Sequence, residues 1–236
     1  MDPAVGSPPK SFLAGARRLG LELDARAIDR LGTFLDRLLE ANQRFNLTAV
    51  TDLEEAWTRH VLDSLTLLGP LGDAQSIVDV GSGGGLPALP LAIARPDASF
   101  TLIEATGKKA SFLEETAQAL GLTHVRVVRT RAEEAGAPGS PLREAHDAVT
   151  ARAVAPLAVL LELTLPLAKV HGRVIAIKGE KAPQEIAEAK NALELLRGRV
   201  ISSTRTETGT LVVIEKVGPT PNRYPRRPGE PKRSPL

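Results

Sequence analysis

The stretch IVDVGSGGGLPALPLAIAR, residues 77–95, decides the fold of this chain. An apolar, β-prone run interrupted by Asp79 leads into four glycines within five positions, and a mostly apolar segment follows. Glycine adopts backbone conformations that other residues avoid, and it lets the chain come close to a ligand. A helix that begins after the glycines points unpaired N–H groups at that ligand, and proline is tolerated in its first turn. The stretch therefore predicts a strand, a ligand-binding turn and a helix.

Strands and helices alternate on the carboxyl side of this stretch. We expect strands at residues 76–80, 99–104, 124–129, 147–151 and 173–178, and helices at 85–95, 108–120, near 132 and at 157–168. Strands joined by crossover helices pair in parallel, so the pattern predicts a doubly wound α/β sheet. A further helix at 183–196 precedes two strands, 198–203 and 211–215, with no helix between them. This hairpin makes one edge of the predicted seven-stranded sheet antiparallel.

The amino-terminal part of the chain has a helical pattern instead. Residues 11–23 fit a short helix, and Asp24 is a good N-cap for a longer one that ends near Asn42. Thr51 or Asp52 can cap a third helix, which continues to residue 68. We therefore divide the chain into four parts: a disordered leader (1–10), a helical region (11–72), an α/β domain (73–217) and a carboxyl-terminal tail (218–236).

The tail concentrates basic charge that the rest of the chain lacks. The net charge of the 236 residues is only +2, whereas residues 218–236 hold five lysines and arginines against one glutamate. Charge separated in this way indicates a polyanionic partner, although a solvated, disordered tail would have the same composition. The six prolines of this segment argue against regular structure.

The overall composition is that of an ordinary globular protein, with 42% hydrophobic and 25% charged residues. The chain has no cysteine, so disulfides and thiolate metal ligands are excluded, and we expect no metal site. The first residues lack the basic and apolar parts of a signal peptide. No stretch approaches the roughly 20 apolar residues of a membrane span. We expect a cytoplasmic protein that is monomeric and makes no membrane contact.

The residues after the glycines narrow the choice of ligand. A P-loop requires Lys followed by Ser or Thr after its last glycine, but Leu86 and Pro87 follow Gly85, which excludes a P-loop. The dinucleotide pattern G-x-G-x-x-G/A fits only when it begins at Gly83 and ends at Ala88. That match is weak by itself, so the glycines leave a dinucleotide and an adenosyl group open.

Two carboxylates favour S-adenosylmethionine. Asp79 lies inside the strand before the glycines, where an acid suits a cationic or amino-bearing ligand and repels a pyrophosphate. Glu104 ends the next strand, where it can accept hydrogen bonds from both hydroxyls of an adenosine ribose. Glu104 does not separate S-adenosylmethionine from NAD, but the antiparallel hairpin is typical of class I methyltransferases. Asp79 could instead be a buried acid satisfied by the protein, and Glu104 could stabilise the next helix N-terminus.

Eight segments along the chain, together with the strand end at Glu104, share the pattern of one family. They are RFNLTAVTD from Arg44, RHVLDSL from Arg59, DVGSGGGLPALPLAI from Asp79, KKASFL from Lys108, RAEE from Arg131, ARAVAPL from Ala151, IKG from Ile177 and NRYPRRPGEPKRSPL from Asn222. On these segments, which span nearly the whole chain, it resembles the RsmG family, also called glucose-inhibited division protein B. The glycine loop combined with RHVLDSL and the carboxyl-terminal signature makes this resemblance specific.

The resemblance implies a Rossmann-like, S-adenosylmethionine-dependent class I methyltransferase. The implied product is N7-methylguanine in the 530 loop of 16S rRNA (rRNA position 527), and the partner is that rRNA, naked, in the 30S subunit or in an assembly intermediate. With the glycine loop, the cofactor-binding residues would be Asp79, Gly81, Ser82, Gly83, Gly85, Leu86, Glu104, Ala105, Thr106, Ala132, Glu133 and Arg152. The RNA-binding residues would be Arg44, Asn46, Thr48, Arg59, His60, Lys178, Arg223, Tyr224, Arg226, Arg227, Lys232 and Arg233. Among the few aromatic residues, Tyr224 is expected to be free to stack on a base.

The implied chemistry requires little from acid–base groups. Guanine N7 carries an unprotonated lone pair at neutral pH, so direct in-line attack needs no obligatory general base, and we assign no catalytic residue. Positioning the reacting atoms at roughly 3 Å can contribute about 7–11 kcal/mol, and the base must be unpaired because an A-form major groove is deep and narrow. Three other functions stay open: another methyltransferase on the same fold, an NAD-dependent oxidoreductase, and a non-catalytic RNA-binding module.

Overall fold

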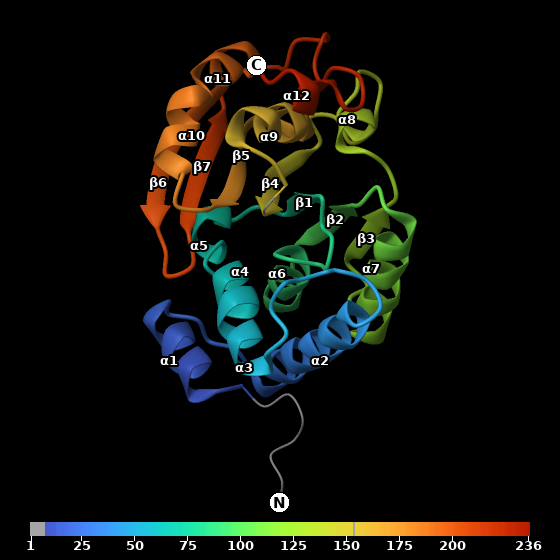
Figure 1. Ribbon diagram of the computed structural model, residues 1–236, viewed down its shortest axis with the longest axis vertical. Coiled ribbons are helices and arrows are strands. Elements are labelled where there is room, and N and C mark those ends of the chain that lie inside the picture. The colour runs from blue at the N-terminus through green and yellow to red at the C-terminus, as the bar shows by residue number, and fades with distance from the viewer. Residues whose placement is uncertain (1–7, 153) are drawn as a thin grey trace, which may run out of the picture.

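The computed structural model describes residues 8–152 and 154–236 (Figure 1). Among these residues, seven strands form one sheet in the order β3-β2-β1-β4-β5-β7-β6. The strands are β1 (Ser76–Val80), β2 (Ser99–Ile103), β3 (Val125–Val128), β4 (His146–Arg152), β5 (Ala168–Lys178), β6 (Gly198–Arg205) and β7 (Thr210–Lys216). Strands β1 to β5 pair in parallel, and β7 is antiparallel to both β5 and β6. The predicted parallel sheet with an antiparallel edge hairpin is confirmed.

The centre of the sheet is buried on both faces, as the apolar sequence of β1 requires. Successive side chains of a strand point to opposite faces: Ile77 packs into the core on one face, and Val78 and Val80 pack into the core on the other. Strand β1 has β2 on one side and β4 on the other, so the strand order reverses there. In open α/β sheets ligands bind at the carboxyl ends of the strands beside such a switch point.

Helices cover both faces of the sheet, as predicted. The face that includes Ile77 is covered by the amino-terminal helices, α6 (Ala88–Ala94) and α7 (Gly107–Ala119). The opposite face is covered by α8 (Ala132–Ala135), α9 (Leu157–Thr164), α10 (Ala182–Glu188) and α11 (Lys190–Leu196). The helix predicted over 183–196 is two helices in the structure, α10 and α11, which are separated at Ala189. None of the described helices has the length and apolar character needed to cross a membrane.

The amino-terminal helices share one hydrophobic core with the sheet. They are α1 (Lys10–Arg18), α2 (Ala25–Asn42), α3 (Leu53–Ala56), a π-helical turn η1 (Trp57–Leu62), α4 (Asp63–Leu65) and α5 (Leu68–Leu71). Asp24 caps α2 as predicted, because its carboxylate accepts a hydrogen bond from the Ala27 N–H. Asp52, rather than Thr51, caps α3 by accepting from Glu55 N–H. The leader predicted over residues 1–10 lies mostly outside the described residues, and α1 already begins at Lys10.

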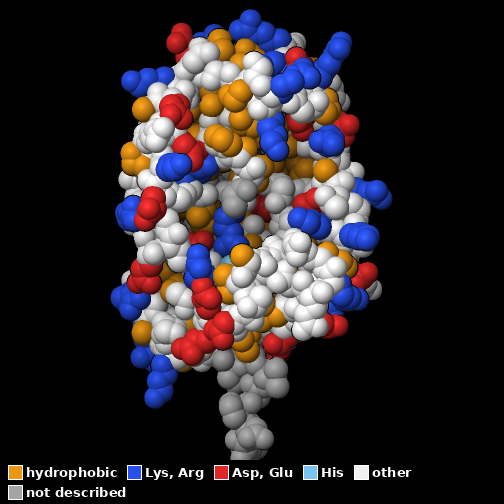
Figure 2. Space-filling model, in the orientation of Figure 1, with side chains coloured by type: hydrophobic (Ala, Val, Ile, Leu, Met, Phe, Trp, Pro, Cys, Tyr) orange, Lys and Arg blue, Asp and Glu red, His pale blue; other side chains and the backbone are white. Residues whose placement is uncertain are grey.

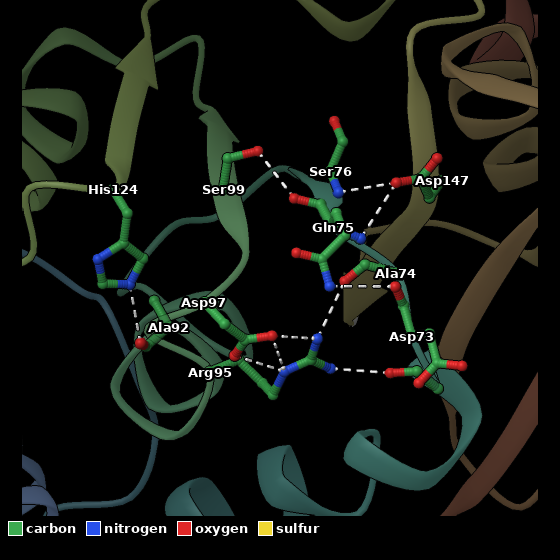
Figure 3. A network of polar contacts seen from close by, with 11 residues as sticks. Asp73, Ala74, Gln75, Ser76, Ala92, Arg95, Asp97, Ser99, His124 and Asp147 are labelled. Carbon is green, nitrogen blue, oxygen red and sulfur yellow. Dashed lines mark hydrogen bonds and ion pairs between the residues drawn. The ribbon is translucent and has the colours of Figure 1, made fainter.

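A polar network closes the amino-terminal edge of the sheet (Figure 3). The Asp147 carboxylate accepts hydrogen bonds from the backbone N–H groups of Gln75 and Ser76, at 3.1 and 2.9 Å. The Arg95 guanidinium bonds Asp97 and also donates to the carbonyl oxygens of the loop that precedes β1. These side chains satisfy backbone groups of connecting loops. The carboxyl-terminal edge is therefore the one that can receive a ligand.

The tail folds onto the face of the sheet opposite to the amino-terminal helices. In Figure 1 it lies beside α8 and α9, while α1 to α3 lie at the other end of the molecule. It includes a short helix, α12 (Glu230–Arg233). The expectation that the tail has no regular structure is therefore wrong for these residues. Charged side chains of the α/β domain hold its backbone, and composition alone does not reveal such partners.

Candidate functional site

The glycine loop leaves β1 and turns toward α6 at the carboxyl edge of the sheet. The N–H groups of Gly81 and Ser82 both donate to the Ile103 carbonyl at the end of β2, at 2.9 and 3.1 Å. The backbone at Gly85 has a φ of +86°, and a Cβ placed there would lie 2.5 Å from the Leu89 side chain. This position therefore requires glycine. Helix α6 begins at Ala88, later than predicted, because residues 81–87 form the turn.

The amino-terminal helical region forms one wall of this loop. A Cβ placed on Gly84 would lie 2.9 Å from the Leu38 side chain of α2 and 3.4 Å from the Cβ of Leu47. A side chain larger than hydrogen would require the Leu38 methyl group to move. Part of the site is therefore formed by the helical region, a contribution that the spacing of the glycines does not reveal.

Asp79 is buried beneath the loop and is only partly satisfied by the protein. Its Oδ1 accepts a hydrogen bond from the Thr150 hydroxyl of β4 at 2.7 Å. Its Oδ2 has no hydrogen-bond partner among the described residues. Burial raises the pKa of Asp79 to about 7, against the opposing effect of the hydrogen bond from Thr150. A buried carboxylate oxygen without a partner is uncommon. It suits a ligand that donates a hydrogen bond or carries positive charge, as S-adenosylmethionine does.

Glu104 joins the loops that follow β1 and β2. One carboxylate oxygen accepts from the Gly83 N–H at 3.0 Å, and the other accepts from the Thr106 N–H at 2.7 Å. Each oxygen retains a further lone pair, so the carboxylate is positioned and can still accept ribose hydroxyls. Ala105 and Thr106 are exposed beside it. Leu86, which is also predicted to bind the cofactor, is almost fully buried at the other end of the loop.

The region predicted to bound the adenine is connected to the tail. Ala132 and Glu133 begin α8, as expected for the residues after β3. The Glu133 carboxylate accepts a hydrogen bond from the Gly229 N–H of the tail at 2.9 Å. Sequence reasoning missed this contact because the two residues are 96 positions apart.

Arg152 brings the predicted cofactor and RNA residues together. It ends β4, and its guanidinium donates to the Arg59 carbonyl at 3.2 Å and approaches Asp63 Oδ2 at 3.4 Å. Its Nη2 lies 3.3 Å from His60 Nδ1. The RHVLDSL segment thus packs over the end of β4. Asp63, which the sequence left without a role, is the residue of this group that the prediction missed.

His60 is buried and held at both ring nitrogens. Arg152 can only donate, so Nδ1 accepts and Nε2 carries the proton, which it donates to the Thr48 hydroxyl at 2.6 Å. Burial, and after it the positive charge of Arg152, lowers the pKa of His60 to about 4. The imidazole is therefore neutral at pH 7, with no nitrogen free to accept a proton from a substrate.

The loop between α2 and α3 presents the other predicted RNA residues. The Asn42 side chain accepts from the N–H groups of Leu47 and Thr48, which fixes the shape of the loop. Arg44 and Asn46 are exposed on it. Arg59 is exposed nearby and pairs with Glu55 at 2.7 Å. Figure 2 shows that basic and acidic side chains are interspersed on the face it displays, which is hollowed near its middle, and do not form one continuous basic field.

Besides the buried His60, three predicted RNA residues are not free to contact RNA in this structure. Tyr224 is 5% exposed and packs into the core beneath the tail, so the expectation that its ring can stack on a base is wrong. Lys178 is buried, and its ammonium bonds Glu185 and the Ala155 carbonyl. Arg226 forms an ion pair with the fully buried carboxylate of Glu162. Because Glu162 lies 64 positions from Arg226, the local sequence does not reveal this partner.

The remaining basic residues of the tail are accessible. They are Arg223, Arg227, Lys232 and Arg233. Arg143 was missed by sequence reasoning. Its guanidinium donates to the Tyr224 and Thr220 carbonyls at 2.8 and 2.7 Å, and so holds the tail against the domain.

Comparisons with known proteins identify the family of this chain. A family model described as rRNA small subunit methyltransferase G (GidB) matches residues 27–212. A protein called Ribosomal RNA small subunit methyltransferase G from Sorangium cellulosum is 48% identical over 94% of this chain and 93% of its own length. Proteins of the same name from Roseiflexus sp. and Lactobacillus johnsonii are 48% and 41% identical, over 95% and 97% of this chain and 98% and 99% of their own lengths.

Solved structures share the fold at low identity. Cofactor-bound Rv0187 from MTB has a TM-score of 0.60 and 16% identity, covering 92% of this chain and 99% of its own. A SAM dependent methyltransferase from Aquifex aeolicus has a TM-score of 0.54 and 20% identity, covering 69% of this chain and 93% of its own. The fold is therefore that of S-adenosylmethionine-dependent methyltransferases, in agreement with the predicted cofactor. The family match and the near full-length relatives show that this chain belongs to the rRNA small subunit methyltransferase G family.

Proposed function

We propose that the protein transfers a methyl group from S-adenosylmethionine to N7 of a guanine in the 530 loop of 16S rRNA. Membership of the rRNA small subunit methyltransferase G family supports rRNA as the substrate. The observation that carries the cofactor assignment is the pair of buried carboxylates at neighbouring strand ends. Asp79 has an oxygen without a partner among the described residues, and Glu104 is held by two loop N–H groups.

These carboxylates and the glycine loop suit the two ends of S-adenosylmethionine, which supplies an electrophilic methyl group when bound. Asp79 is the acceptor for its cationic or amino-bearing part. Glu104, with Ala105 and Thr106 beside it, receives the ribose, and Ala132 with Glu133 bounds the base. In this arrangement the protein binds and orients the cofactor. Glu104 would repel a phosphate on the ribose, so the site favours an adenosine whose hydroxyls are unphosphorylated.

The side chains of the site favour transfer by positioning rather than by acid–base catalysis. His60 is neutral, and both of its nitrogens already have partners. Guanine N7 has no proton to lose, so it needs no general base. The remaining task of the protein is to hold an unpaired guanine in line with the methyl group. Such orientation of the reacting groups lowers the barrier to transfer.

The RNA would approach over the loop 43–51 and the end of β4. Arg44 and Arg59 are exposed there and can contact phosphates. The exposed residues of the tail lie further away and add electrostatic attraction. We expect the protein to act as a monomer on naked rRNA, on the 30S subunit or on an assembly intermediate.

The test is transfer of a labelled methyl group to 16S rRNA, naked and within 30S particles, followed by mapping of the modified base. We expect label at N7 of one guanine in the 530 loop. Label on another base, or only on small molecules or proteins, would refute the assignment. Calorimetry with S-adenosylhomocysteine and with NAD separates the oxidoreductase alternative, which requires binding of NAD.

A further inference from the structure

Asp63 is a buried acid at a junction of three elements. It begins α4 directly after the π-helical turn and is 5% exposed. Its Oδ1 accepts a hydrogen bond from the hydroxyl of Thr208, in the turn between β6 and β7. Its Oδ2 faces Arg152 at the end of β4. The proposed methyl transfer requires no direct contact between Asp63 and either the cofactor or the guanine.

Arg152 lies between two buried acids, Asp63 and Asp79. Residues two apart on a strand point to the same face of the sheet, so Arg152 shares its face with Thr150, whose hydroxyl bonds Asp79. Arg152 and Asp79 are close enough for each charge to shift the pKa of the other. The guanidinium nevertheless makes its polar contacts on the other side, with Asp63, the Arg59 carbonyl and His60.

In this arrangement Arg152 does not pair with Asp79. A guanidinium and a carboxylate form strong paired hydrogen bonds when nothing competes. If Arg152 turned to Asp79, it would occupy the carboxylate oxygen that has no partner among the described residues. The competing acid is Asp63, which faces the same guanidinium from the helical region.

We infer that Asp63 is a positioning residue: it holds Arg152 toward the helical region and so keeps the second oxygen of Asp79 free for the cofactor. The inference rests on the proposed function, because it takes the amino-bearing part of S-adenosylmethionine as the ligand of Asp79. Through Thr208 the same carboxylate also ties the β6–β7 turn to the site. Asp63 touches no reacting atom and acts only through Arg152.

The first test uses His60 as a reporter of where Arg152 lies, in the protein without cofactor. Burial and Arg152 hold the pKa of His60 near 4. The Arg59 backbone and the Glu55 charge raise this pKa, the Arg59 charge lowers it, and Thr48 bonds the ring. In Asp63→Asn we expect the pKa of His60, measured by NMR titration, to rise as Arg152 departs. Removing the negative charge of Asp63 alone would lower this pKa. With amide exchange around His60 unchanged, which shows that the ring is still buried, a rise reports the movement of Arg152. An unchanged or lower pKa overturns the inference.

The second test is calorimetric binding of S-adenosylhomocysteine as a function of pH. We expect Asp63→Asn to weaken binding by about tenfold, a factor within the range usual for coupled sites. Affinity should change with pH as Asp79 titrates. In Asp63→Asn the midpoint of this change should lie at lower pH, because pairing with Arg152 lowers the pKa of a carboxyl group. The Glu104 charge also raises the pKa of Asp79, and the Thr150 hydroxyl lowers it. The substitution leaves both of these residues unchanged.

Matched variants separate this role from a structural one. Asp63→Glu retains the charge and should retain tight binding and the low pKa of His60. Thr208→Val removes only the hydrogen bond from the β6–β7 turn and should bind like the unsubstituted protein. If Asp63→Asn does not fold, Asp63→Ser removes the same charge with a smaller side chain.

The outcomes also distinguish this inference from the proposed function. If the unsubstituted protein binds no S-adenosylhomocysteine, the proposed function fails. If it binds, and Asp63→Asn binds with the same affinity and the same pH midpoint, only the role of Asp63 is overturned.

Discussion

Two regions of the molecule each bury a carboxylate next to an arginine, with opposite results. Under the tail, Glu162 is fully buried and Arg226 closes on it, with contacts of 2.5 to 3.2 Å from its guanidinium and a further bond from its backbone N–H. At the end of β4, Arg152 lies near the buried Asp79 but makes its contacts elsewhere. The first acid is satisfied by the protein, whereas the second retains a free oxygen for a ligand.

The difference separates a structural ion pair from a binding site. A buried charge is tolerated when it is fully paired, and an unpaired one raises the energy of the folded state. Perturbed acids with unmet hydrogen-bonding capacity gather at functional sites for that reason. The charge of the tail had suggested an RNA-binding arm, but one of its arginines, Arg226, instead fixes the tail to the domain. The helical region supplies the residues that meet Arg152 at the site.

The largest expected effect is a loss of stability when the ion pair between Arg226 and Glu162 is broken. Arg226→Ala leaves the Glu162 carboxylate buried without its counter-ion, which should lower the free energy of unfolding by about 3–5 kcal/mol. Arg227→Ala is the matched control, because that side chain is exposed and should change stability by less than about 0.5 kcal/mol. Urea denaturation measures both. Equal stability of the two variants would break the distinction between the two regions.

The next effect concerns pH and the site. The folded-state pKa of Asp79 is raised to about 7 from its ordinary 3.8, so the folded protein binds an extra proton between these values. Stability from this group is present below about pH 4 and is lost as pH rises to about 7, by an amount on the order of 4 kcal/mol. Asp79→Asn should remove this loss, so the variant should gain stability relative to the unsubstituted protein as pH rises. Thermal unfolding of the cofactor-free proteins across this window measures the difference.

The same substitution should have the opposite effect on binding. Asp79→Asn removes a charged acceptor, and charged hydrogen bonds contribute about 1.5–3 kcal/mol. We expect S-adenosylhomocysteine affinity to fall by that amount in calorimetry, while Glu162→Gln should leave affinity nearly unchanged. A variant that is more stable at neutral pH but binds less tightly is the signature of a residue kept for function. A fall of the same size in Glu162→Gln would show that the tail, too, controls the cofactor site.

The smallest effects concern RNA electrostatics. Neutralising Arg44 and Arg59 together should weaken rRNA binding and reduce the slope of log affinity against log salt by about 1 for each phosphate that is no longer neutralised. Neutralising Arg227 and Lys232 gives the matched pair in the tail and should have a smaller effect on methyl transfer. Filter binding at several salt concentrations measures the slopes. A larger slope change for the tail pair would restore the tail as the main RNA-binding surface.

Deletion of the whole tail is a poor test of RNA binding. It would remove Arg226 from Glu162 and Gly229 from Glu133 at once. Loss of stability and of cofactor affinity would then accompany any loss of RNA affinity. Point substitutions at Arg226, Arg227 and Lys232 keep these effects apart.

Much of the fold and part of the site could be predicted from short-range patterns. The alternation of apolar runs and helical segments predicted the order and type of the strands, because burial on both faces requires such runs. The glycine spacing and Asp79 indicated the loop and the acid beneath it. Helix boundaries were less accurate at α6 and at Ala189, where turn geometry and packing, rather than periodicity, end or begin the helix.

By itself the sequence determined the α/β sheet, the position of the ligand-binding loop and membership of the family, since these depend on residue types within a few positions of one another. Only the tertiary structure decided which charged groups are free. Arg152 meets Asp63 across 89 positions, and Arg226 meets Glu162 across 64. The physical reason is that the protonation and accessibility of a charged side chain depend on burial and on the nearest opposite charge, and in a folded chain both come from residues far away in the sequence.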